Sequence, residues 1–169
     1  MDLQNYIRDI SDFPKPGVVF KDITPLLGNA EALKVCANAL KNLYQGKQVD
    51  KVIGIEARGF IFGAMLAERL GAGFVPVRKK GKLPYEVVSK AYSLEYGEDV
   101  LEIHKDAIQP GDRVLIHDDV LATGGTARAV CDLVKEAGGI VVQCNFIIKL
   151  EFLNGEDKLD APVASLFTF

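Results

Sequence analysis

The chain has 169 residues, of which 49% are hydrophobic and 25% charged, and its formal net charge is −3. This composition is typical of a soluble globular protein, and the small negative charge gives no electrostatic basis for general binding to nucleic acid or to membranes. No apolar run reaches the length of a membrane span, and the amino terminus lacks the basic region and apolar centre of a signal peptide. Three widely spaced cysteines fit reduced thiols, so we expect one cytoplasmic domain over residues 1–169.

The amino-terminal stretch cannot form a long regular element. Four residues within its first 28 interrupt helices and strands: Pro14, Pro16, Gly17 and Pro25. We expect residues 1–28 to form a hood, a braced segment that lies over the rest of the chain. The next stretch, from Asn29 to Tyr44, has apolar residues at helical spacing, and Asn29 is a suitable N-cap. We interpret this helix as scaffold.

A strand, a charged loop and a helix follow between Val52 and Leu70. The strand Val52 to Ile55 and the apolar helix up to Leu70 flank the loop Glu56-Ala57-Arg58-Gly59. Lone charges beside a core are costly unless they are paired. One interpretation is a salt bridge between Glu56 and Arg58. The other is that Arg58 presents its guanidinium to a pyrophosphate at the carboxyl ends of the strands.

A dense basic run follows the next predicted strand, Phe74 to Val77, in the sequence RKKGK. Such runs usually form a solvated face, but this one begins at a strand end, at the same edge as the preceding loop. Alternating residues further on predict an antiparallel excursion from the sheet, with a flexible loop and hairpin over residues 80–105. Neither His104 nor His117 has a partner pattern for a metal or a catalytic triad, so we interpret both as structural or surface residues.

The stretch from Arg113 to Ala127 reads RVLIHDDVLATGGTA. It predicts a buried strand ending at two acids, then a glycine-rich loop and the start of a helix. Free N–H groups and the helix dipole make such a unit a phosphate site, although it lacks the lysine of a nucleotide P-loop. Paired acids suit either a metal ion or the hydroxyls of a ribose, and a phosphorylated sugar carrying Mg²⁺ satisfies both.

The predicted helix ends at Gly138-Gly139, and IVVQCNFII forms another apolar strand before a closing strand or loop in APVASLFTF. The whole pattern predicts an α/β fold, Rossmann-like, with a mainly parallel sheet of about five strands and helices on both faces. In this class the site lies at the carboxyl ends of the strands.

The string DDVLATGGTA resembles the phosphoribosyl pyrophosphate loop of the type I phosphoribosyltransferases, in which two acids precede a Thr-Gly-Gly-Thr turn. Four further strings, FPKPGVVFKDITPLL, EARGFIFG, RKKGKLP and SLEYG, are similar to the adenine-specific branch of the family, and the resemblance covers nearly the whole chain. It implies a pentosyltransferase of purine salvage that converts adenine and phosphoribosyl pyrophosphate to AMP and pyrophosphate. It also implies Mg²⁺ as cofactor and a homodimer, without nucleic-acid or membrane partners.

The resemblance assigns roles to individual residues. Phosphate binding falls to the loop Ala122, Thr123, Gly124, Gly125 and Thr126. Catalysis falls to Arg58, Glu95, Asp118 and Asp119. In this assignment Glu95 moves a proton to or from the adenine imidazole ring, and Tyr96 helps to close the site. Mg²⁺ arrives with the substrate, and Asp118 and Asp119 are its candidate protein contacts.

Pyrophosphate binding is implied for Ala57, Arg58, Arg78, Lys79 and Lys82, of which the last three reach the neighbouring subunit's pyrophosphate. The Ala57-Arg58 bond is expected to be a cis peptide. Adenine binding is implied for Val19, Phe20, Lys21 and Leu150. Lys21 and Lys149 depart from the family pattern, which often has Arg and an acid at these positions.

Two alternatives remain open at this point. The same fold could act on guanine, hypoxanthine or xanthine, because few contacts select the base. A regulator that binds phosphoribosyl pyrophosphate without catalysis would be expected to carry an added DNA-binding segment and a basic face, which the sequence lacks.

Overall fold

The computed structural model describes residues 1–94 and 97–169. Contacts group the chain into two compact units, Met1–Ala39 and Leu40–Phe169. The predicted single domain with a hood remains a prediction. None of the helices within the described residues combines the length and the hydropathy that crossing a bilayer requires.

The first unit contains a short antiparallel hairpin. Its strands, β1 (Arg8–Ser11) and β2 (Val19–Asp22), have four residues each, in line with the predicted absence of long elements. The unit also holds two short helices and the start of a longer one: η1 (Leu3–Tyr6), α1 (Thr24–Leu27) and α2 (Ala30–Asn42). The predicted N-cap is confirmed, because Asn29 Oδ1 accepts hydrogen bonds from the N–H groups of Glu31 (3.1 Å) and Ala32 (2.9 Å).

The described residues of the second unit form a seven-stranded sheet in the order β5-β6-β4-β3-β7-β8-β9. The strands are β3 (Lys51–Ile55), β4 (Gly73–Lys79), β5 (Val87–Ser93), β6 (Glu98–His104), β7 (Arg113–Leu121), β8 (Ile140–Lys149) and β9 (Val163–Thr168). The helices are α3 (Gly59–Leu70), α4 (Gly125–Glu136), η2 (Glu151–Leu153) and η3 (Gly155–Lys158).

The sheet matches the predicted fold class. Strands β4, β3, β7, β8 and β9 run parallel, and β6 and β5 add an antiparallel hairpin at one edge, as expected for residues 80–105. One strand is longer than expected: β7 continues through the two acids to Leu121 instead of ending at them. The reason is that β8 pairs with it along this length, up to Leu121 opposite Lys149.

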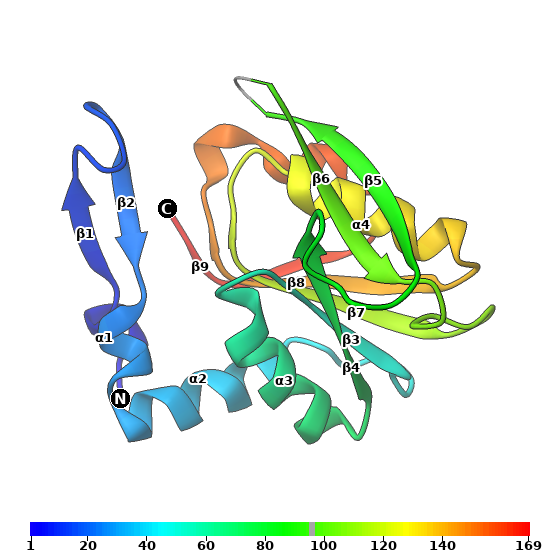
Figure 1. Ribbon diagram of the computed structural model, residues 1–169. Helices are drawn as coiled ribbons and strands as arrows, with labels where there is room; N and C mark the ends of the chain where they lie inside the picture. Colours follow the sequence, from blue (N-terminus) through cyan, green and yellow to red (C-terminus); the bar gives the residue numbers. More distant parts are fainter. Residues whose placement is uncertain (95–96) are drawn as a thin grey trace. The chain divides into compact units, whose positions relative to one another are not determined.

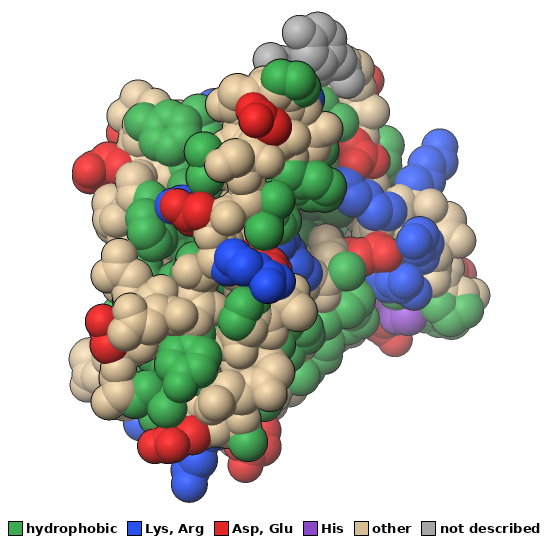
Figure 2. All heavy atoms as spheres, turned by 90° about the vertical axis from the view of Figure 1, so that its left-hand side faces the viewer, with side chains coloured by type: hydrophobic (Ala, Val, Ile, Leu, Met, Phe, Trp, Pro, Cys, Tyr) green, Lys and Arg blue, Asp and Glu red, His purple; other side chains and the backbone are tan. Residues whose placement is uncertain are grey.

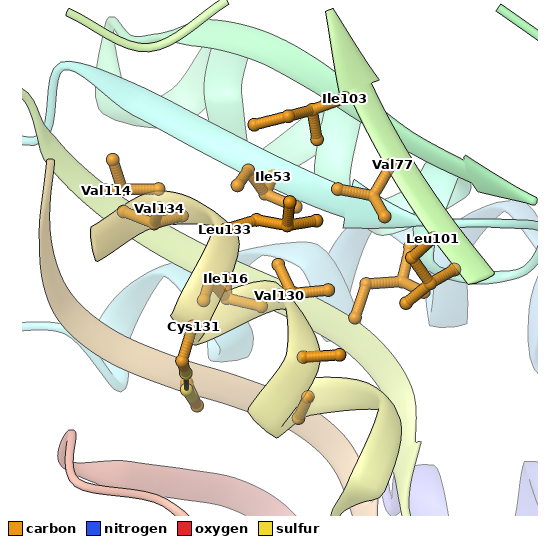
Figure 3. Close-up of a cluster of buried hydrophobic side chains, with 14 of the residues drawn as sticks. Ile53, Val77, Leu101, Ile103, Val114, Ile116, Val130, Cys131, Leu133 and Val134 are labelled. Atoms are coloured by element: carbon orange, nitrogen blue, oxygen red, sulfur yellow. Dashed lines mark hydrogen bonds between the residues drawn. The ribbon is translucent and has the colours of Figure 1, made fainter. Parts of the chain in front are cut away.

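Helices cover both faces of the sheet (Figure 1). Helix α3 packs on β3, β4 and β7, whereas α4 packs on the opposite face against β5, β6, β7 and β8. Figure 3 shows side chains of α4, including Val130 and Leu133, packed against Ile53 of β3 and Ile116 of β7. Burial of these apolar side chains stabilises the sheet and holds its carboxyl edge in place.

Candidate active site

Three loops meet at the carboxyl edge of the sheet. Strand β3 lies between β4 and β7 and runs parallel to both, with Gly54 opposite His117 and Ile55 opposite Val77. The segments that follow these strands therefore emerge side by side: the loop 56–59, the basic turn 78–82 and the loop 122–126. The structure thus confirms that the sequence-predicted charged and glycine-rich segments share one edge.

Glycines let the amino terminus of α3 approach the acids of β7. A Cβ atom on Gly59 would lie 2.9 Å from Asp118 Oδ1 and 3.0 Å from His117 O, and one on Gly54 would lie 2.8 Å from Gly59 O. Any side chain at these positions would separate the helix from the sheet. The first turn of α3 therefore lies directly beside Asp118, where its N–H groups and dipole favour negative charge.

The two adjacent carboxylates of Asp118 and Asp119 occupy a poorly solvated position. The Asp119 side chain is only 6% exposed, and its Oδ2 lies 2.8 Å from Arg58 Nε in an ion pair. Asp118 Oδ1 accepts a hydrogen bond from Asp119 N–H (2.9 Å). Burial, and then the charge of Asp119, raise the pKa of Asp118 well above its ordinary value. Burial also raises the pKa of Asp119, while Arg58 opposes this rise. Because the ionised carboxylates are poorly solvated, a ligand that donates hydroxyl hydrogen bonds or a bound cation would stabilise them.

The loop from Ala122 to Thr126 forms a small pocket of about 70 Å³. Its lining includes Asp118, Thr123, Gly124, Thr126, Ala127 and Phe146. Gly124 has φ +82°, which favours glycine, and α4 begins at the next residue. Because the first N–H groups of a helix have no partner within it, the pocket combines free donors with the positive end of the dipole. An anion such as a phosphate is therefore the ligand that fits it best.

Among the described residues, the ion pairs of Glu56 are with the basic turn, whereas Arg58 pairs with Asp119. Its Oε2 accepts a hydrogen bond from Lys79 N–H (2.8 Å), and its Oε1 pairs with Arg78 (3.4 Å) and Lys82 (3.1 Å). Although burial works against it, these hydrogen bonds hold the pKa of Glu56 below its ordinary value. The interpretation of a Glu56–Arg58 salt bridge was wrong, because the parallel register of β3 and β4 brings Glu56 to the end of β4 instead. Figure 2 shows a similar intermixing of basic and acidic side chains on one face of the molecule.

The remaining predicted pyrophosphate contact, Lys79, belongs to a network at the base of the hairpin. Its Nζ forms an ion pair with Asp99 and a hydrogen bond with Tyr92 Oη (3.0 Å). Burial lowers the pKa of Lys79, but hydrogen bonds with Asp99 and Tyr92 outweigh it and raise the pKa. Sequence reasoning missed both Glu56 and Asp99 as partners of this turn, because each lies 20 residues or more from the lysine it contacts. Glu95 and Tyr96 lie outside the described residues.

The predicted adenine contacts lie on two separate segments. Val19, Phe20 and Lys21 belong to β2, where Lys21 pairs with Asp9 of β1 (2.7 Å). In the second unit, Leu150 N–H donates to Leu121 O (2.9 Å), so Leu150 is tied to the start of the phosphate loop. Their role in adenine binding stays a prediction.

Two further observations concern Lys149 and a cis peptide bond in the 56–59 loop. Lys149, one of the two expected departures, pairs with Glu156 (3.1 Å). The cis peptide of the 56–59 loop joins Glu56 to Ala57, so its expected position at Ala57-Arg58 was wrong by one residue. The resemblance identified the loop, but nothing in the residue types distinguishes one of its bonds from the next.

His117 forms a buried network behind the acids, consistent with the structural role that was expected of it. Asn145 Nδ2 donates to Leu40 O (3.1 Å) and Gln143 Oε1 (3.2 Å), so Asn145 Oδ1 accepts from His117 Nδ1 (3.1 Å). Burial lowers the pKa of His117 to about 4 from its ordinary 6.5, against the effect of Asn145. The ring is therefore neutral at physiological pH, and it keeps its proton on Nδ1.

The depressed pKa of His117 predicts an acid-sensitive stability. As the pH falls, His117 takes up a proton near pH 6.5 in the unfolded chain but only near pH 4 in the folded chain. The contribution of the neutral His117 to the free energy of unfolding is therefore complete above pH 6.5 and is lost as the pH falls towards 4. The loss amounts to about 3 kcal/mol of unfolding free energy. Urea unfolding of the unliganded protein at several pH values would measure it. His117→Gln should have a flatter profile over this range, and an unchanged slope would contradict the assignment.

Comparison with known proteins agrees with this geometry. Residues 23–167 match the family model of the phosphoribosyl transferase domain. An adenine phosphoribosyltransferase of Flavobacterium johnsoniae is 59% identical over all of both chains. Among solved structures, the enzyme of that name from Rhodothermus marinus has a TM-score of 0.94 at 56% identity, covering 99% of this chain and 96% of the other.

A second solved structure is informative about ligands. The adenine phosphoribosyltransferase of Saccharomyces cerevisiae, complexed with an imino-altritol bisphosphate and adenine, has a TM-score of 0.93 at 41% identity and covers 97% of this chain and 96% of its own. The family model and these relatives extend over nearly the whole chain. The chain belongs to the phosphoribosyltransferase family and, within it, to the adenine phosphoribosyltransferases.

Proposed function

We propose that the chain transfers the phosphoribosyl group of phosphoribosyl pyrophosphate to adenine, giving AMP and pyrophosphate in purine salvage. The observation that carries this proposal is the meeting of three segments at one sheet edge: two adjacent carboxylates, a glycine-rich helix start and a basic turn. Each segment suits one part of the sugar substrate. The names of the relatives, and the adenine in the yeast complex, support adenine as the base.

In this proposal the loop Ala122 to Thr126 binds the 5′-phosphate as a handle that positions the ribose. Asp118 and Asp119 accept hydrogen bonds from the ribose hydroxyls. When pyrophosphate leaves, positive charge develops on the sugar ring, and the transition state resembles an oxocarbenium ion. The carboxylates of Asp118 and Asp119, when ionised, would offset that charge in a poorly solvated site, where electrostatic interactions are strong.

The leaving group needs cations. Arg58, at the start of α3, lies next to the acids, and Arg78, Lys79 and Lys82 lie on the neighbouring turn. Each of these four side chains forms an ion pair with an acid of the protein. To bind pyrophosphate, they must exchange these acids for the oxygens of the pyrophosphate. We propose that the basic turn serves the neighbouring subunit of a homodimer, as the family resemblance implies.

Mg²⁺ fits the acids of the site. Among the described residues no group of three or more His, Cys, Asp and Glu side chains could hold a metal alone, whereas Asp118 and Asp119 offer carboxylate oxygens on adjacent residues. A bound cation would favour the ionised form of Asp118, whose pKa is raised by burial and by Asp119. Mg²⁺ commonly binds through one or two carboxylates together with substrate phosphates and water. When bound, it would neutralise charge on the pyrophosphate. The same proposal places the enzyme in the cytoplasm, which suits its three free cysteines.

Glu95→Gln should lower kcat by about 10² to 10⁴-fold, because the proposal assigns general acid–base chemistry on adenine to this carboxylate. Binding of phosphoribosyl pyrophosphate should not change, since the phosphate loop and acids remain intact. Steady-state rates and calorimetric titration would separate the two effects. Glu98→Gln, three residues further along the chain at the start of β6, is the matched control and should keep full turnover. Undiminished kcat in Glu95→Gln would remove this role.

The base is tested directly by a substrate panel. Adenine, hypoxanthine, guanine and xanthine are each incubated with phosphoribosyl pyrophosphate and Mg²⁺, and nucleotide formation is followed by chromatography. We expect turnover with adenine only, and its loss when EDTA removes the metal. Preference for another base would overturn the adenine assignment while keeping the reaction class.

A further inference from the structure

A buried glycine outside the predicted site touches the phosphate loop. Gly155 begins η3, and a Cβ atom built on it would overlap Ala122 O and lie 2.9 Å from Gly124 N. Conversely, a Cβ on Gly124 would overlap Gly155 O and lie 2.9 Å from Gly155 C. Real Cβ atoms essentially never come closer than 3.0 Å to such neighbours. The two backbones therefore contact each other with no room for a side chain.

The segment that carries Gly155, residues 154–160, is held by contacts from two elements, β8 and α4. Lys149 at the end of β8 pairs with Glu156 (3.1 Å). Arg128 of α4, the helix that begins in the phosphate loop, donates to Lys158 O (3.1 Å). These contacts hold the residues just after Gly155, and the hydrogen bond from Asn154 N–H to Glu151 O (3.0 Å) holds the residue before it. The segment therefore cannot retreat easily, and added volume at Gly155 would displace the phosphate loop.

We propose that Gly155 is a positioning residue for the phosphate loop: its bare backbone fixes Ala122 and Gly124 where they bind the 5′-phosphate. The inference rests on the proposed function for the identity of that phosphate. A loop displaced by a fraction of an ångström loses the alignment of several N–H donors at once. The contact also joins the phosphate loop to the segment that starts at Leu150, the predicted adenine contact.

The test compares binding at two subsites in a folded protein. Gly155→Ala should raise the Kd of ribose 5-phosphate about tenfold or more, since small misplacements have large effects on positioning. The Kd of inorganic pyrophosphate, which the proposed function assigns to the other two loops, should change less than about twofold. Calorimetry measures both, and circular dichroism checks the fold. Asp157→Ala, an exposed change two residues on in the same segment, is the matched control and should bind both ligands as the wild type does.

Three results would overturn the proposal: unchanged affinity for ribose 5-phosphate, equal weakening of both ligands, or the same loss in Asp157→Ala. If Gly155→Ala does not fold, Glu156→Gln releases the Lys149 contact without adding volume, and it should weaken ribose 5-phosphate selectively by a smaller factor. Neither measurement requires adenine or turnover. Failure of the proposed reaction would instead appear as absent AMP formation by a wild type that still binds ribose 5-phosphate.

Discussion

Replacing Asp118 with Asn should lower AMP formation by about 10² to 10³-fold and, at the same time, stabilise the unliganded protein. The activity falls because the substitution removes a negative charge from beside the developing oxocarbenium ion, and one electrostatic contact of this kind has about that effect. The stability rises because burial and Asp119 disfavour the ionised Asp118 carboxylate in the folded state. Asn keeps the oxygen that accepts from Asp119 N–H.

The sign of the stability change depends on pH. The pKa of Asp118 is higher in the folded than in the unfolded chain. At a pH where the unfolded chain carries the ionised carboxylate, this group therefore lowers the free energy of unfolding. The gain from Asp118→Asn should therefore be largest at neutral pH and shrink on acidification, as thermal melting would show. Asp119→Asn is the matched control: it should lose comparable activity with a smaller gain in stability, because the ion pair with Arg58 already opposes the effect of burial on Asp119. A lower melting temperature of Asp118→Asn at pH 7 would contradict this account.

Replacing Arg58 with Ala should reduce kcat/KM for phosphoribosyl pyrophosphate by about 10² to 10³-fold, as expected when a cation is removed from a leaving group. Arg58 lies at the start of α3 and pairs with Asp119 at 2.8 Å, so its loss also leaves a buried carboxylate without that cation. Its side chain is 37% exposed, so the destabilisation should be smaller than that of a fully buried pair.

Arg58→Lys separates the two roles of Arg58. Lysine keeps the charge but loses the planar fork that can bridge a carboxylate and a phosphate. We expect it to restore most of the stability and only part of the activity. Steady-state kinetics and melting temperatures of the three proteins would measure this, and full activity of Arg58→Ala would exclude a contact with the leaving group.

Local patterns in the sequence predicted the elements that build the site. Around Gly124 and Gly125, the apolar strand, the two acids, the glycines and the helical spacing are all read within about fifteen residues. The N-cap at Asn29 is equally local and is confirmed. Such features depend on neighbouring residues, which is why sequence reasoning recovers them.

Contacts between distant segments could not be predicted in the same way. Glu56 pairs with Lys82 across 26 residues, and Lys79 pairs with Asp99 across 20, because the register of β3, β4 and β6 brings them together. The contact of Gly155 with Gly124 likewise depends on how the segment after β8 folds back. No periodicity encodes these partners, so charge and glycine content indicated a site without indicating its internal pairing.

The most direct test of the account is AMP formation by the wild type from adenine, phosphoribosyl pyrophosphate and Mg²⁺, run beside Asp118→Asn under identical conditions. We predict rapid turnover by the wild type and almost none by the variant, although both bind ribose 5-phosphate. Turnover that survives in Asp118→Asn would show that the paired acids do not carry the chemistry. Binding of phosphoribosyl pyrophosphate without any AMP from the wild type would contradict the enzyme assignment and point to a sensor.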